Sequence, residues 1–156
     1  MRLYPVVVAV LLVTTQAHAD AGATLRVNLR NASGKIVGFA VFYEIIDAPN
    51  TNVVIDVTGL PPGQHVVSLR EGPTCDPPEF KSVGALLNPG HTLHSYRNTM
   101  PITVSTNGKG HAALDSDLLI TMVMGHTIVI DAQNADDPTQ KSGRIIACGS
   151  IPNLRH

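Results

Sequence analysis

The sequence predicts an all-β fold, an antiparallel sandwich or flattened barrel of about eight strands. Short runs rich in β-branched residues alternate with segments rich in Gly, Pro and Asn, and no window holds a capped helical period of useful length. The segment DLLITMVMG at 117–125 is ambiguous between strand and helix. The expected strands are residues 24–30, 36–46, 52–57, 65–69, 101–106, 111–114, 126–132 and 144–148.

Turn residues set the connections between these strands. TLRVNLR alternates between polar and apolar residues, and NASGK at 31–35 supplies a turn, so the first two strands are expected to form a hairpin. GLPPG at 59–63 turns the chain into the fourth strand. Residues 72–100, with four prolines, are too long for a hairpin connection, and 133–143 form a shorter polar loop. Long ordered loops on a sandwich commonly carry function.

The first 19 residues have the pattern of a secretory signal peptide. Arg2, an apolar run at 6–13 and the triplet AHA at 17–19 predict cleavage before Asp20, and the apolar run is too short to span a bilayer. One domain at 20–156 is expected, in the periplasm or secreted. Without Arg2 it carries 10 basic and 12 acidic residues, a net charge near −2, which indicates no nucleic-acid or anionic-membrane partner.

Two cysteines, Cys75 and Cys148, are present. Because an exported protein meets an oxidising compartment, one intramolecular disulfide is expected, with two free thiols as the alternative.

An ordered set of short motifs runs from about residue 24 to 151: GLPPG with His65, Glu71, Cys75, Asn88-Pro89, Asn107-Gly108, Ala135-Asp136-Asp137 and Ala147-Cys148-Gly149. In this order the set resembles the Cu,Zn superoxide dismutases of bacterial periplasms. The resemblance implies an eight-stranded Greek-key sandwich, a Cys75–Cys148 disulfide that pins the long loop to the last strand, and two loops that build the metal site in active members.

The copper ligands of the family are not retained at the matching positions. Two histidines of the copper strand match Ser68 and Arg70, the metal-bridging histidine matches Leu86, and the fourth matches Asp131. His65 matches a histidine that supports the site without binding metal. A hydroxyl, a guanidinium, an isobutyl group and one carboxylate cannot hold a redox-active copper ion.

The zinc ligands are also mostly lost. Their positions match Leu86, His94, Tyr96 and Thr99, and of these only His94 keeps the family's ligand. Zinc takes four ligands, or three and a water. The resemblance therefore implies that neither copper nor zinc is a cofactor.

A rearranged metal site is the alternative. It would use His65, His91 and His94, with Asp131, to hold copper or zinc and retain weak dismutase activity. Outside it, His111 and His126 are expected at the surface.

Arg70 and Asp131 carry opposite charges on neighbouring strands, so we predict an ion pair between them in or beside the former copper position. A partly buried carboxylate there needs a cationic partner. The alternative is that both side chains point into solvent. Leu86, being apolar, is expected to help fill the vacated space.

Two further residues match functional positions of the family. Arg144 is a degenerate match to the arginine that steers superoxide, because the family's R-x-A-C is one residue longer here; without a bulge its side chain would face the other way. Asp136 matches a carboxylate that orients metal-bound histidines, and a loop-stabilising role is expected for it here.

These observations predict an exported pseudoenzyme that acts as a binding or structural module with an unknown protein partner, and they leave a homodimer open. A metal-binding protein or weakly active dismutase is the alternative. The sequence holds no nucleophile elbow, phosphate-binding Gly loop, HExxH or CxxC motif.

Overall fold

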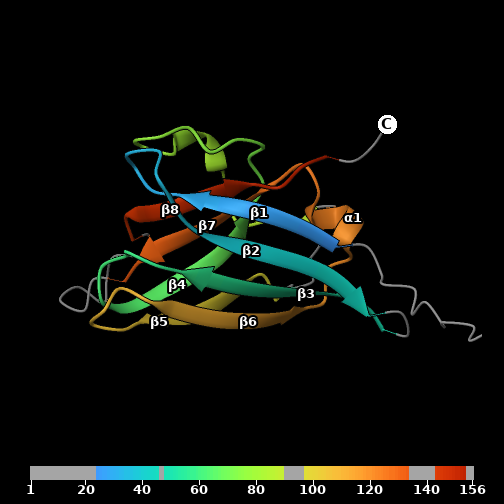
Figure 1. Ribbon diagram of the computed structural model, residues 1–156. Helices are drawn as coiled ribbons and strands as arrows, with labels where there is room; N and C mark the ends of the chain where they lie inside the picture. The colour runs from blue at the N-terminus through green and yellow to red at the C-terminus, as the bar shows by residue number, and fades with distance from the viewer. Residues whose placement is uncertain (1–23, 46–47, 90–96, 134–142, 154–156) are drawn as a thin grey trace, which may run out of the picture.

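Eight antiparallel strands close into a barrel (Figure 1), in a computed structural model that describes residues 24–45, 48–89, 97–133 and 143–153. Their order around the barrel is β1-β2-β3-β6-β5-β4-β7-β8. The strands are β1 Thr24–Arg30, β2 Ile36–Ile45, β3 Ala48–Val57, β4 Gly63–Arg70, β5 Thr99–Val104, β6 Gly110–Ser116, β7 Thr127–Ala132 and β8 Ile145–Ser150. Two short helical turns, η1 Lys81–Val83 and α1 Ile120–Val123, complete the described chain, in which no helix is long and apolar enough to cross a membrane.

The strand order confirms the predicted all-β Greek-key class. β4, β5 and β6 are successive neighbours, while β3 lies beside β6 and β7 lies beside β4. Closure is narrow, because β1 meets β8 at the pair Arg30–Cys148 and β5 meets β6 at Val104–Gly110. The barrel is therefore flattened into the sheets β1-β2-β3-β6 and β5-β4-β7-β8, and the first of these lies in front in Figure 1.

Most predicted strands are in the right place, with differences at their ends. β3 starts at Ala48 rather than at 52, because a register shift after Glu44 lets it extend its pairing with β2. The ambiguous segment 117–125 contains the single turn α1, in which Ile120 and Val123 face the core. Glu44 fixes the start of this turn by accepting a hydrogen bond from the Ile120 N–H at 3.1 Å.

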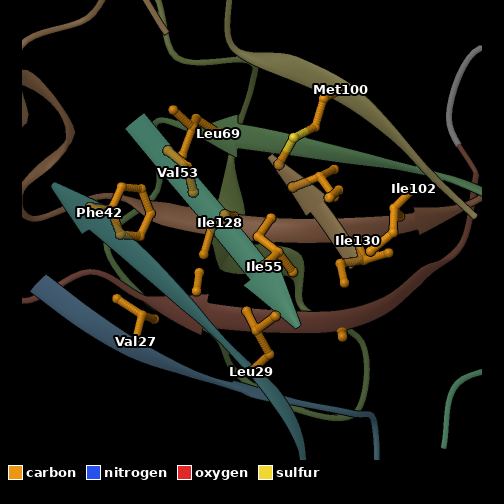
Figure 2. Packing of buried hydrophobic residues seen from close by; sticks show 14 of the residues in the cluster. Val27, Leu29, Phe42, Val53, Ile55, Leu69, Met100, Ile102, Ile128 and Ile130 are labelled. Atoms are coloured by element: carbon orange, nitrogen blue, oxygen red, sulfur yellow. The ribbon is translucent and has the colours of Figure 1, made fainter. Parts of the chain in front are cut away.

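The core lies between the two sheets (Figure 2). Leu25, Val27 and Leu29 of β1 are buried while the residues between them are exposed, as the alternating sequence predicts. Phe42 of β2 and Ile55 of β3, in the same sheet, are fully buried on the same inner face.

A smaller apolar cluster lies on the outer side of β7 and β8, under the long loop. Phe80 and Val83 from the loop pack there against Val129 and the Cys75–Cys148 disulfide. The predicted disulfide is thus confirmed, and it joins the loop to the last strand. The Cys75 N–H adds a hydrogen bond to Ser150 Oγ at 3.1 Å.

We expect the double variant Cys75→Ala/Cys148→Ala to lose about 4 kcal/mol of unfolding free energy, because the disulfide closes a long loop in the unfolded chain. Urea titration followed by circular dichroism measures the loss. Reductant should destabilise the wild-type protein similarly and leave the variant unchanged. Equal stability of variant and wild type would contradict the role given to this bond.

Candidate functional site

The candidate site lies on the outer face of β4. Side chains of this strand point alternately toward the core and away from it, so the site is separate from the core. Val67 and Leu69 point inward and belong to the core, so Ser68 and Arg70 point outward. Asp131 of β7 lies directly opposite Val66, the next outward residue. Because directly opposed residues share a face, Asp131 lies on the same side as Ser68 and Arg70.

A turn built on two glycines delivers the chain into β4. Gly59 and Gly63 have φ angles of 72° and 130°, a region that favours glycine. His65 holds this turn from the inner side, with its Nε2 2.7 Å from the carbonyl oxygen of Pro61.

Ser68, Arg70 and Asp131 form a closed hydrogen-bonded triangle, here called the Arg70 network. Arg70 Nη2 donates to Asp131 Oδ2 at 3.0 Å, and Arg70 Nε donates to Ser68 Oγ at 2.9 Å. Ser68 Oγ in turn donates to Asp131 Oδ2 at 3.2 Å. The predicted Arg70–Asp131 ion pair is confirmed.

Burial makes this network more than a surface ion pair. The side chains of Arg70 and Asp131 are 20% and 10% exposed, and Ser68 is 2% exposed. A carboxylate this sheltered from water needs compensation, which the guanidinium and the hydroxyl provide.

The backbone of Leu86 lies beside the network, but its side chain does not fill the space at the former copper position. Arg70 and Leu86 form an isolated β-bridge, and the Leu87 N–H donates to the Leu69 carbonyl at 3.0 Å. Leu86 is 45% exposed, so its expected filling role is wrong. The alternation within the bridge instead sends Leu87, 2% exposed, into the core.

Asn98 is a contributor that sequence reasoning missed. Its Nδ2 donates to the Leu87 carbonyl at 2.8 Å, and its own carbonyl accepts from the Leu69 N–H at 2.9 Å. It thereby joins Leu87 in the long loop and the segment just before β5 to the end of β4. The sequence offers one weak indication of this role, the position of Asn98 directly before the strand β5.

The former zinc positions are only partly described. Thr99 is exposed and lies opposite Ser68, on the outer face. His94 and Tyr96, like His91 of the alternative metal site, lie outside the described residues, as does Asp136. Within residues 24–45, 48–89, 97–133 and 143–153, no three His, Cys, Asp or Glu side chains are grouped to hold a metal ion.

The described histidines make their hydrogen bonds to residues outside the Arg70 network. His65 is buried on the core side of β4, so it cannot share an ion with Asp131 on the outer face. His126, which was expected at the surface, is half-buried, with Nδ1 2.8 Å from the Glu71 carbonyl oxygen. His111 is exposed as expected and pairs with Asp56 at 2.8 Å.

A β-bulge in β8 lies between Arg144 and the Ala147-Cys148 pair. Ile130 pairs with Ala147 but Asp131 pairs with Ile145, so β8 holds one extra residue at this point. Arg144 is exposed, and its carbonyl accepts the Ala132 N–H at 2.8 Å. The bulge that absorbs the extra residue is present. Arg144 stays a degenerate match to the steering arginine, and no catalytic role is expected for it.

The comparisons with known proteins bear on both the fold and this site. The model of the copper/zinc superoxide dismutase (SODC) family matches residues 36–151. This chain belongs to that family. A Cu-Zn superoxide dismutase of Deinococcus radiodurans is 35% identical over 161 residues, which cover 85% of this chain and 87% of the relative.

Solved structures related to the dismutase family share the barrel. The Cu/Zn superoxide dismutase from Brucella abortus superposes with a TM-score of 0.64 at 19% identity, over 83% of this chain and 99% of that one. A SOD-like protein from Bacillus subtilis gives 0.64 at 25% identity, over 81% and 97%.

The residues at the matching positions do not fit the family's copper. Copper in such a site is held by several imidazoles, whereas Ser68 and Arg70 offer a hydroxyl and a guanidinium. The carboxylate of Asp131 is the one common metal ligand here, and it is already paired with a cation.

We expect Arg70→Met to cost about 2 kcal/mol of unfolding free energy, because it leaves the sheltered Asp131 carboxylate without its cation. Combining it with Asp131→Asn should return about 1 kcal/mol, a coupling that a double-mutant cycle in urea measures. Arg144→Met is the matched control at an exposed arginine and should change stability by less than about 0.5 kcal/mol. Strict additivity of the two network substitutions would contradict the coupling.

Proposed function

We propose that this protein is an exported pseudoenzyme of the copper/zinc superoxide dismutase family, a binding or structural module that carries neither copper nor zinc. The observation that carries the proposal is the Arg70–Asp131 ion pair at the positions that match copper ligands.

The charge of Arg70 argues against a copper ion at this place. A copper ion bound to Asp131 would lie close to a guanidinium whose Nη2 is 3.0 Å from the same oxygen. Like charges at such separations in a sheltered site repel strongly. Copper would have to displace Arg70, and among the described residues no three His, Cys, Asp or Glu side chains are grouped to hold the ion in its place.

Export is supported by the N-terminal sequence and the disulfide. Residues 1–19 contain, in sequence, the basic start, apolar run and small-residue cleavage site of a signal peptide. Disulfides such as Cys75–Cys148 persist in oxidising compartments.

A binding or structural role is supported by the way the long loop is held. Backbone hydrogen bonds join Glu71 to Ala85 and Gly72 to Val83, and the disulfide fixes the loop to β8. The part of the loop at residues 72–85 is held by these contacts within the protein, and preordered loops on rigid scaffolds are common binding surfaces.

Metal content and superoxide consumption test the proposal. Protein purified from the periplasm, before and after loading with copper and zinc, should hold well under one copper per chain by mass spectrometry and show no turnover above the buffer. The Cu/Zn dismutase of a relative, assayed in parallel, is the positive control. Stoichiometric copper with turnover would establish the alternative, an active or metal-binding dismutase.

Restoring the ligands tests whether the backbone still positions them. The variant Ser68→His/Arg70→His/Leu86→His/Asp131→His should bind about one copper per chain, because all four positions lie together around the end of β4. Electron paramagnetic resonance should then show nitrogen coupling to the copper. Gln64→His, an exposed change on the same strand, is the control. Failure of the folded quadruple variant to bind copper would contradict the match of these positions to the family's site.

A further inference from the structure

The turn between β5 and β6 contains a chemically labile pair of residues, Asn107 and Gly108. Asn107 is the only asparagine of the sequence that is followed by glycine. Gly108 has a φ angle of 78° and closes the hairpin, a place at which glycine is favoured. Because glycine has no side chain, its backbone nitrogen can approach the side-chain amide of the preceding asparagine without hindrance.

The reaction open to this pair is deamidation. The Gly108 nitrogen loses its proton to hydroxide and forms a bond to Asn107 Cγ. The bond from Cγ to Nδ2 breaks, and Nδ2 takes up a proton from water and leaves as ammonia. Water then opens the resulting succinimide ring at either carbonyl, which gives an aspartate or an isoaspartate at position 107. In the isoaspartate, the main chain runs through Cβ and Cγ and therefore gains a methylene group.

Hydrogen bonds of the folded turn oppose this attack. The Gly108 N–H donates to the Ser105 carbonyl oxygen at 2.9 Å, which occupies the proton that the attacking nitrogen has to lose. Asn107 Oδ1 accepts the Lys109 N–H at 3.1 Å and also accepts from the Ser105 hydroxyl, so the side-chain amide is fixed. We expect attack only after these hydrogen bonds have opened.

Gly108 also packs closely against the turn that begins β4. A Cβ atom placed on Gly108 would lie 3.1 Å from the Gly59 nitrogen and 3.5 Å from the Leu60 carbonyl oxygen. Leu60 is itself buried and belongs to the core. Because packed contacts leave little free space, an extra methylene group in the main chain next to Gly108 would push the two turns apart.

The turn at 31–35 provides a comparison within the same chain. Asn31 N–H and Gly34 N–H make backbone hydrogen bonds that correspond to those of Ser105 and Gly108. The sequence is NASGK here and STNGK in the β5–β6 turn, so the order of asparagine and serine is reversed. A Cβ atom on Gly34 would meet nothing within 4 Å. This turn therefore has the same hydrogen bonding but neither the labile pair nor the close contact.

We propose that Asn107 is a site of spontaneous deamidation, at a rate set by opening of the β5–β6 turn, and that its isoaspartate product weakens the junction with the turn before β4. Water is the reagent and ammonia the leaving group, so no enzyme is needed. The site lies near the start of β4, whereas Arg70 ends that strand. The proposal therefore stands or fails independently of the metal content of the protein.

Peptide mass spectrometry after incubation in mildly alkaline buffer tests the role of turn opening. Deamidation at position 107 should be at least about tenfold slower in the folded protein than in guanidinium chloride, because only the open turn reacts. Ser105→Ala should speed the reaction of the folded protein by about fivefold, since a hydrogen bond that fixes Asn107 is lost. The same substitution should have no effect in guanidinium chloride.

Three results would overturn this part of the proposal. They are equal rates in the folded and unfolded protein, a folded rate that Ser105→Ala leaves unchanged, and no product from the folded protein even in the Ser105→Ala variant. The double variant Ser105→Asn/Asn107→Ser is the matched control, because it copies the order of the turn at 31–35 and removes the labile pair. It should fold like the wild type and show no deamidation at position 107.

The stability of the aged protein tests the effect of isoaspartate. Ion exchange separates the modified chains, and an isoaspartyl methyltransferase assay identifies those with isoaspartate. Their melting temperature should be lower by about 4 °C or more, a shift typical of a substantial local defect in a domain of this size. Asn107→Asp adds the same charge without the methylene group and should melt close to the wild type. An equal loss in Asn107→Asp would show that charge rather than chain length is responsible.

Moving the labile pair to the other turn tests the contact with Gly59. Adding Asn31→Ser/Ser33→Asn to the matched control places an asparagine before Gly34, where there is open space. Its isoaspartate form should lose less stability than the isoaspartate form of the wild type. Equal losses at the two positions would overturn the proposed strain at the junction before β4.

Discussion

The two-residue alternation of β4 is the constraint on which both the core and the candidate site depend. Val67 and Leu69 pack inside the barrel while Ser68 and Arg70 lie outside it. Six register pairs with β7 hold this arrangement. A slip of one residue would expose the two apolar side chains and bury a guanidinium, so the register is strongly specified. Substitutions at the outward positions can therefore change the chemistry of the site without disturbing the core.

Contacts within the protein hold the described part of the long loop, residues 72–89 and 97–98, against the barrel. Bound metal could cross-link a loop to the barrel, and here the backbone bridge at Leu86, the hydrogen bonds of Asn98 and the Cys75–Cys148 disulfide do so. The Arg70 network adds little net stability of its own, because desolvation of its charges offsets much of their attraction. Its main effect is to satisfy Asp131, which would be costly to bury alone.

Much of the fold could be predicted because alternation and turn residues are local signals, as TLRVNLR and GLPPG illustrate. α1 could not be predicted, since a single turn is too short to establish a helical period. The Arg70–Asp131 pair was predictable from opposite charges on strands that the family places side by side. The hydrogen bonds of Ser68 within the network could not be predicted. Nor could the burial of Leu87 in place of Leu86, because an isolated β-bridge inside a loop leaves no periodic pattern in the sequence.

Family membership and activity depend here on different residues. The match over residues 36–151 includes the turn before β4, the cysteines and the inward-facing positions of every strand except β1. Chemistry depends on outward-facing side chains, which the fold leaves free to vary. The same freedom applies to the second sheet, where Val41 and Val54 point outward beside a fully packed core. Because side chains alternate across a closed barrel, the outer face of one sheet can hold an ion pair at the positions that match copper ligands. The outer face of the other sheet can carry apolar residues such as Val41 and Val54.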